Sequence, residues 1–210
     1  MAELINYYKI NGAYVLAQFN RHFLISIYGV LFACIVSIPL GFYIARNKKL
    51  AKWVISFANI IQTIPSLAML SMLMVVMGLG VNTVIVTVFL YSSLPILKNT
   101  YTAVSNVDKS MLDIAKGVGM TKGQIMLKVE LPLSLSIIIG GIKNALVVAI
   151  GVTAIGTFIG AGGLGDIISR GINVSNGGAI VLAGALPTAL MAVIADLILT
   201  KVEDKLKPNM

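Results

Sequence analysis

The two longest stretches without a charged residue decide what this chain can fold into. Asp, Glu, Lys and Arg are absent from residues 23–45 and again from residues 53–97. A membrane-spanning helix needs roughly 20 apolar residues, so the first stretch is long enough for one span. The second is too long for one span and has to fold back on itself, and the sequence GLGVN at residues 78–82 supplies a turn. The chain is therefore expected to be an all-α integral membrane protein.

Two further apolar stretches complete the pattern. Residues 131–165 are interrupted only by Lys143, and residues 179–200 only by Asp196. Charged residues make up 11% of the 210 positions, whereas soluble domains carry about a quarter. We predict five spans, near residues 23–45, 54–77, 81–97, 134–157 and 179–200. Four of them contain a proline, which a membrane helix tolerates where neighbours satisfy the freed carbonyl: Pro39, Pro65, Pro95 and Pro187.

The spans form one membrane domain, residues 23–200. Residues 1–22 precede it as an external or interfacial segment, in which Asn11-Gly12 is expected to interrupt a short helix. This segment has neither a basic start nor an early apolar core, so it is not predicted to be a cleaved signal peptide. Residues 98–131 form the longest polar segment, and residues 201–210 form a tail.

The distribution of basic residues predicts the orientation. Twelve of the 16 Lys and Arg residues fall in the segments 46–52, 98–128 and 201–207. Five spans place these three segments on one face, which the positive-inside rule makes cytoplasmic. The N-terminus is then outside the cell and the C-terminus is in the cytoplasm. We interpret the net charge of +8 as a topology signal and expect no nucleic-acid partner.

A glycine motif after the fourth span matches the fingerprint of a dinucleotide-binding enzyme, but its context does not support that function. Gly160, Gly162 and Gly165 spell G-x-G-x-x-G, but they follow the fourth span on the outer side and lack the βαβ context of a dinucleotide site. A tight turn or a close helix approach is the favoured interpretation. His22 and Cys34 are the only residues of their types, so no zinc site is expected. We predict no catalytic residue, and no metal or cofactor bound by this chain.

The polar segment 98–131 has the pattern of two short helices. Asp108 can cap a helix with an apolar stripe of Met111, Leu112, Ala115 and Val118. Gly119 ends that helix, with a positive φ and little room for a β-carbon expected there. Thr121 can cap a second helix. From composition alone, this segment could simply pack against its own spans.

Within this segment lies a resemblance to a known signature. Asp113-Ile114-Ala115, Gly119 and Val129-x-Leu131-Pro132 resemble the E-A-A-x3-G-x9-I-x-L-P motif of binding-protein-dependent ABC importer permeases. Asp113 stands for Glu, Ile114 for Ala and Val129 for Ile. The resemblance implies the transmembrane domain fold of type I ABC importers and a cytoplasmic coupling helix that docks on an ATPase. The residues it assigns to this role are Asp113, Ala115, Gly119, Met120, Thr121, Leu131 and Pro132, of which Asp113, Ala115 and Met120 are expected to face the ATPase.

The resemblance extends over almost the whole chain. Residues 61–80, 89–104, 160–168 and 179–199 resemble permeases of glycine betaine, carnitine and choline importers, although methionine permeases share GAGGLGD. It implies transport of a quaternary-ammonium osmoprotectant by alternating access. The implied partners are a second permease, identical or closely related, two cytoplasmic ATPase subunits that bind ATP, an external substrate-binding protein and membrane lipid. A self-contained secondary transporter or channel, or a permease for another small solute such as methionine, is the alternative.

Two further sets of residues are candidates for a role within the membrane. Aromatic faces hold quaternary ammonium groups, and Phe89, Tyr91 and Phe158 are candidate contacts along the substrate path. Lys143 and Asp196 both lie near the cytoplasmic ends of their spans. We expect them to pair or to share a polar cluster, with independent snorkelling to the interface as the alternative.

Overall fold

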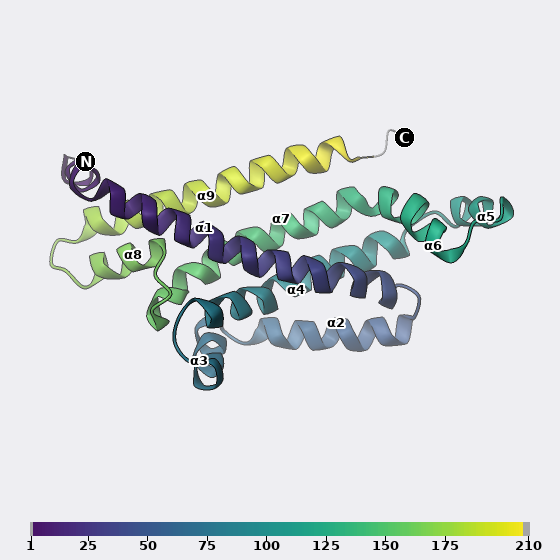
Figure 1. Ribbon diagram of the computed structural model, residues 1–210, viewed down its shortest axis with the longest axis horizontal. Coiled ribbons are helices and arrows are strands. Elements are labelled where there is room, and N and C mark those ends of the chain that lie inside the picture. Colours follow the sequence, from purple (N-terminus) through teal and green to yellow (C-terminus); the bar gives the residue numbers. More distant parts are fainter. Residues whose placement is uncertain (1, 208–210) are drawn as a thin grey trace.

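Four long helices run along one axis of the molecule (Figure 1). They are α1 (Ala2–Ile44), α4 (Val81–Ser105), α7 (Leu131–Ile155) and α9 (Gly178–Lys205). The computed structural model describes residues 2–207, and every regular element in that part of the chain is helical. Helix α4 packs between α1 and α7, and α9 packs on the other side of α7. Within residues 2–207, four helical stretches are long and apolar enough to cross a membrane, which confirms the predicted fold class.

Shorter elements connect these helices and close the two ends of the bundle. Helices α2 (Lys48–Thr63) and α3 (Ser66–Met77) link α1 to α4. At the opposite end from the N-terminus, α5 (Lys109–Gly117), α6 (Lys122–Ile125) and the π-helical turn η1 (Met126–Glu130) link α4 to α7. The 3-10 turn η2 (Gly156–Ile159) and α8 (Leu164–Ile172) link α7 to α9.

Helix α1 runs through the expected N-terminal segment without a break. The predicted interruption at Asn11-Gly12 is wrong, because both residues lie inside the helix. Tertiary contacts explain this: Val15 is buried, and the Tyr8 hydroxyl donates to the Ala183 carbonyl of α9 at 3.2 Å. Such packing outweighs the roughly 1 kcal/mol that an interior glycine costs a helix. At 1.5 Å per residue the helix is about 65 Å long, so it extends well beyond one bilayer core.

The predicted span 54–77 is two helices instead of one. Helices α2 and α3 meet at a break and are bent by 96°. Pro65 explains the bend, because a proline disfavours helical backbone at the residue before it. Ile64 accordingly has an extended backbone with ψ of 127°. The bent pair supplies a fifth membrane crossing only if both helices are counted as one span.

The proline in α4 is compensated from a neighbouring helix. Pro95 has no N–H to donate to the Tyr91 carbonyl one turn earlier. The Gln62 side-chain amide of α2 donates to that carbonyl at 2.8 Å. The Tyr91 hydroxyl in turn donates to the Ile64 carbonyl at the α2–α3 break. The expectation that neighbours satisfy freed carbonyls is confirmed at this proline.

Glycines allow the predicted turn and the closest helix packing. Gly78 and Gly80 have φ of +82° and +112°, so the turn between α3 and α4 is where the sequence places it. On α1, a Cβ added to Gly29 would lie 2.3 Å from the Val88 side chain of α4. These two helices can approach so closely only because α1 has no side chain at that position.

Candidate functional site

The two short helices expected in the polar segment are present, and each begins at a capping side chain. The Asp108 side chain accepts a hydrogen bond from the Ser110 N–H at 2.9 Å, which lowers the pKa of that carboxyl. Gly119 has φ of +81°, and the Met120 N–H donates to the Ala115 carbonyl at 3.1 Å. This is the hydrogen-bond pattern of a Schellman motif. Thr121 and Gln124 form a capping box at the start of α6.

The α5–α6 segment projects from one end of the bundle (Figure 1), and one side of α5 exposes apolar side chains. Met111, Ile114 and Val118, spaced three and four residues apart, are 47%, 64% and 73% exposed. Ala115 and Ile125 are buried. The expectation that Ala115 faces outward is therefore wrong, whereas its neighbour Ile114 is exposed. Gly119 also differs from expectation, because an added Cβ would meet nothing within 4 Å.

The remaining predicted residues of this segment lie along its surface. Asp113 is exposed and pairs with Lys116 at 2.9 Å, one helical turn away. Met120 is half-buried, Thr121 is exposed, and Leu131 and Pro132 begin α7. Met120 and Pro132 also line one surface hollow next to the exposed apolar face. The structure thus gathers most of the predicted residues at one end of the molecule.

A buried ion pair that the sequence analysis missed connects this segment to α1. Pro132 would clash with the carbonyl four residues earlier in a regular α-helix. The chain instead makes the π-helical turn η1, in which the Leu131 N–H reaches back to the Met126 carbonyl. The last residue of that turn, Glu130, is 1% exposed and forms a bidentate pair with Arg46. The available signal was a lone acidic residue directly before the apolar run that begins at Leu131.

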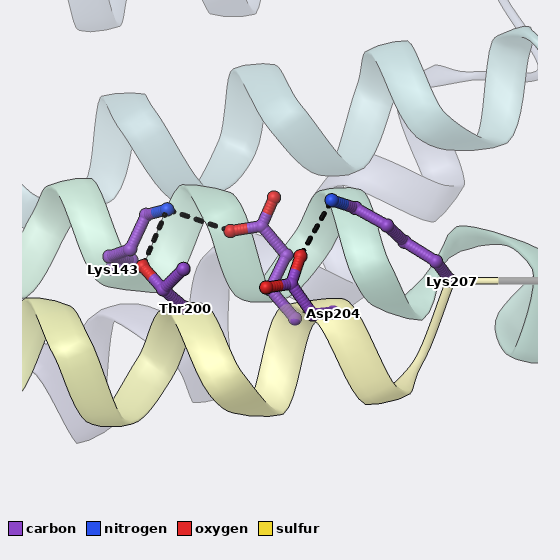
Figure 2. A network of polar contacts seen from close by, with 5 residues as sticks. Lys143, Thr200, Asp204 and Lys207 are labelled. Atoms are coloured by element: carbon purple, nitrogen blue, oxygen red, sulfur yellow. Dashed lines mark hydrogen bonds and ion pairs between the residues drawn. The ribbon is translucent and has the colours of Figure 1, made fainter.

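Lys143 pairs with Glu203 and not with the predicted Asp196. The Lys143 Nζ donates to Glu203 at 2.8 Å and to Thr200 at 3.3 Å, and both ion-pair side chains are about four-fifths buried. Figure 2 shows Lys143 of α7 beside Thr200 of α9, and farther along, Asp204 near the end of α9 in an exposed pair with Lys207, which follows the helix. Glu203 lies seven residues after Asp196, two turns farther along the same helix. The register of α7 against α9, which the sequence does not show, selects Glu203.

We expect Lys143→Met to destabilise the protein more than removal of both charges. The single change leaves the Glu203 carboxylate without its partner in a poorly solvated place, whereas Lys143→Met/Glu203→Met removes both charges. The melting temperature of the purified chain should fall by about 2–4 °C or more for the single variant and recover in the double variant. Asp196→Asn serves as the control and should shift it less. Equal losses in the single and double variants would contradict the pairing.

The glycine motif at the other end of the bundle forms a turn that docks on α1. Gly160, Gly162 and Gly163 have φ of +77°, +70° and +82°, which confirms the predicted tight turn. The Gly163 N–H donates to the Gln18 side chain of α1 at 2.7 Å. Next to it, Asp166 of α8 accepts from the Tyr14 hydroxyl and from Arg170 Nε at 2.8 Å.

The three candidate aromatic residues have different surroundings. Tyr91 is buried, and its hydroxyl and carbonyl both bond to the α2–α3 region. Phe89 packs partly buried against the core of the bundle. Phe158 lies in η2 and is 67% exposed. Tyr91 thus has a structural role that its sequence context did not reveal, and Phe158 is the most accessible of the three.

Several long apolar helices and one projecting helical segment with an exposed apolar face define a polytopic membrane protein. Residues 37–208 match the family model described as binding-protein-dependent transport system inner membrane component. The chain belongs to this family and is a permease subunit of an ABC importer.

Individual relatives and a solved structure agree with this assignment. The chain is 63% identical to the carnitine transport permease protein OpuCD of Listeria monocytogenes serotype 1/2a, over 99% of this chain and 93% of that protein. It is 61% identical to the glycine betaine/carnitine/choline transport system permease protein OpuCD of Bacillus subtilis, over 99% and 91%. A chain of the MetNI methionine ABC transporter, inward facing, superposes with a TM-score of 0.82 at 20% identity, over 92% and 96%, and so shares the fold.

Proposed function

We propose that this chain forms the translocation path of an ATP-driven importer for a quaternary-ammonium osmoprotectant such as carnitine, glycine betaine or choline. Identity of 61–63% over nearly the full length to permeases named for these solutes supports the substrate class. The likeness to a methionine transporter, at 20% identity, supports only the fold. The chain itself is non-catalytic in this proposal, and ATP is bound and hydrolysed by separate subunits.

The observation that carries the proposal is the outward apolar face of α5. Its three exposed side chains, Met111, Ile114 and Val118, follow helical spacing and together resemble the anchor pattern of a helix that lies in a groove. In the complete transporter, α5 of each of the two permeases would dock on one of the two ATPase subunits. Closure of the ATPase pair on ATP would then move the α5–α6 segments and switch the path between its two openings. An external binding protein would deliver the substrate.

Phe158 is the preferred candidate for a weak contact with the substrate. It is the most exposed of the three aromatic residues, and it follows α7 at the end of the molecule opposite to α5. A cation over an aromatic face gains about 0.5–2 kcal/mol. This is enough to guide a quaternary ammonium without an anionic residue in the membrane. Phe89 is a second candidate, from the core of the bundle.

Uptake by the complete transporter tests the proposed function. Proteoliposomes that contain this permease, its ATPase, a partner permease and the binding protein are supplied with labelled carnitine, glycine betaine, choline or methionine. Uptake of a quaternary-ammonium solute should require ATP on the side of the membrane that carries the ATPase. It should also require the binding protein on the opposite side. It should persist when ionophores remove the ion gradients. Gradient-driven uptake by the lone chain, or uptake of methionine alone, would contradict the proposal.

The orientation also forms part of the proposal and can be measured separately. All three basic segments lie at the end of the bundle that carries α5, consistent with a single cytoplasmic face. With Cys34 replaced first, a cysteine at Lys48 should be protected from an impermeant thiol reagent added outside the cell. A cysteine at Asn173, after α8, should react with it. Labelling of position 48 from outside would reject this topology.

A further inference from the structure

One ion pair links the end of α1 to the turn η1, which directly follows the α5–α6 segment. Arg46 Nη1 donates to Glu130 Oε1 at 2.6 Å, and the second guanidinium nitrogen donates to the other carboxylate oxygen. Arg46 follows the last residue of α1 by two positions, and Glu130 ends η1, 84 residues later in the chain. A two-point contact of this kind fixes orientation as well as distance.

Hollows flank this ion pair on both sides. On one side an apolar groove of about 440 Å³ separates the last turns of α1 from η1, lined by Phe42, Tyr43 and Leu127 among others. On the other side a hollow of about 370 Å³ is lined by Leu112 and Lys116 of α5 together with Lys122 and Ile125 of α6. Arg46 lines both hollows. Apolar contacts of Met126 and Leu131 with the Phe42 cluster lie beside the pair, and Arg46–Glu130 is the ion pair that joins the end of α1 to η1.

The carboxylate end of the connection is held rigidly. Glu130 is 1% exposed, whereas the Arg46 side chain is half exposed. The π-helical turn that precedes Pro132 sets the position of Glu130, and both α5 and α6 contact that turn. A displacement of α5 would therefore reach Glu130 through packed contacts, and would reach the end of α1 through Arg46.

We infer that Arg46 and Glu130 are positioning residues that transmit movement of the α5–α6 segment to α1, and so couple ATP hydrolysis to opening of the path. This inference rests on the proposed function, and it adds the route by which the proposed movement leaves the docking segment. Neither residue touches substrate or nucleotide in this role. Their contribution is the two-point hydrogen-bonded link itself.

A double substitution separates this role from simple stabilisation. Arg46→Met/Glu130→Met removes both charges, so no buried carboxylate is left unpaired, and apolar replacement of a buried ion pair commonly preserves stability. In the complete transporter, its membrane abundance, copurifying ATPase and rate of ATP hydrolysis should stay close to those of the wild type. Solute uptake per ATP hydrolysed should fall about tenfold, within the range that substitutions along a coupling route produce. Arg46→Lys keeps the charge but loses the planar fork, and should give an intermediate loss.

The matched control removes an ion pair from the same end of the molecule. Asp204→Met/Lys207→Met deletes an exposed pair 2.7 Å apart at the C-terminal end of α9, and its uptake per ATP should equal that of the wild type. The inference is overturned if Arg46→Met/Glu130→Met keeps the wild-type ratio of uptake to hydrolysis. It is also overturned if uptake falls only in proportion to abundance or to bound ATPase. Absence of a copurifying ATPase from the wild-type protein would instead refute the proposed function.

Discussion

Replacing Gly165 with alanine is expected to remove most of the folded protein from the membrane. A Cβ built at this position lies 2.0 Å from the Ala154 carbonyl oxygen and 2.8 Å from its carbonyl carbon. These are backbone atoms of α7, so no rotamer change relieves the overlap. Helix α8 would have to move away from α7 and thereby disturb its packing on α9. Overpacking in a well-packed core costs about 1–3 kcal/mol, and a backbone overlap belongs at the upper end of that range.

Gly151 provides the matched control for this prediction. It also belongs to α7, but a Cβ there meets nothing within 4 Å. Gly151→Ala should leave abundance and melting temperature unchanged or slightly raised, because alanine favours a helix by about 0.5–1 kcal/mol over glycine. Both variants are compared by membrane abundance and by the melting temperature of the purified chain. If Gly165→Ala behaves like Gly151→Ala, the close approach of α8 to α7 is not what this glycine provides.

Gly165 is the third glycine of the G-x-G-x-x-G motif, and its role differs from that of the first two. The motif lacks the strand context of a dinucleotide site, so a turn or a close approach of helices was the favoured interpretation. The first two glycines of the motif have positive φ, and the third lies directly against α7. Both structural interpretations hold, at different positions of one motif. The turn could be predicted from the sequence because the conformational freedom of a glycine affects the backbone only within a few residues.

Local hydrogen bonding also made the α5–α6 segment predictable. Asp108, Gly119 and Thr121 satisfy backbone groups within four residues of themselves, so their types predict the helix ends directly. The 96° bend between α2 and α3 was not predicted, because no local hydrogen-bonding signal in the sequence marks it. Pro65 stands in an apolar stretch that tolerates either a kinked span or a break, and composition does not distinguish them.

The ion pairs show where sequence reasoning stops. Lys143 was recognised as a charge that needs a partner, but the choice of Glu203 over Asp196 depends on how α7 and α9 are aligned. Arg46 and Glu130 are 84 residues apart, and their meeting depends on the π-helical turn before Pro132. A shift of one residue in either helix rotates a side chain by about 100° and would separate such pairs. Composition and periodicity do not specify how two helices are aligned to within one residue.

Replacing Gly119 with valine should uncouple ATP hydrolysis from the arrival of loaded binding protein while the protein remains in the membrane. Gly119 has φ of +81°, and the space around it is open, so the constraint is the backbone conformation alone. A left-handed conformation costs about 1–2 kcal/mol for a residue with a Cβ, and more for a β-branched one. The Schellman hydrogen bonds at the end of α5 would be lost, and the direction of the chain into α6 would change.

A graded series at this position distinguishes conformation from loss of a small residue. Asparagine tolerates positive φ, so Gly119→Asn should retain most of the stimulated hydrolysis, Gly119→Ala less, and Gly119→Val about a tenth or less, as expected for a loss of about 1.4 kcal/mol or more in coupling. Gly123→Ala is the control in the same segment, because Gly123 has neither a positive φ nor a close neighbour. Membrane abundance, copurifying ATPase and stimulated hydrolysis are measured together for each variant. Full stimulated hydrolysis in Gly119→Val at normal abundance would show that the shape of this segment is not what connects the permease to its ATPase.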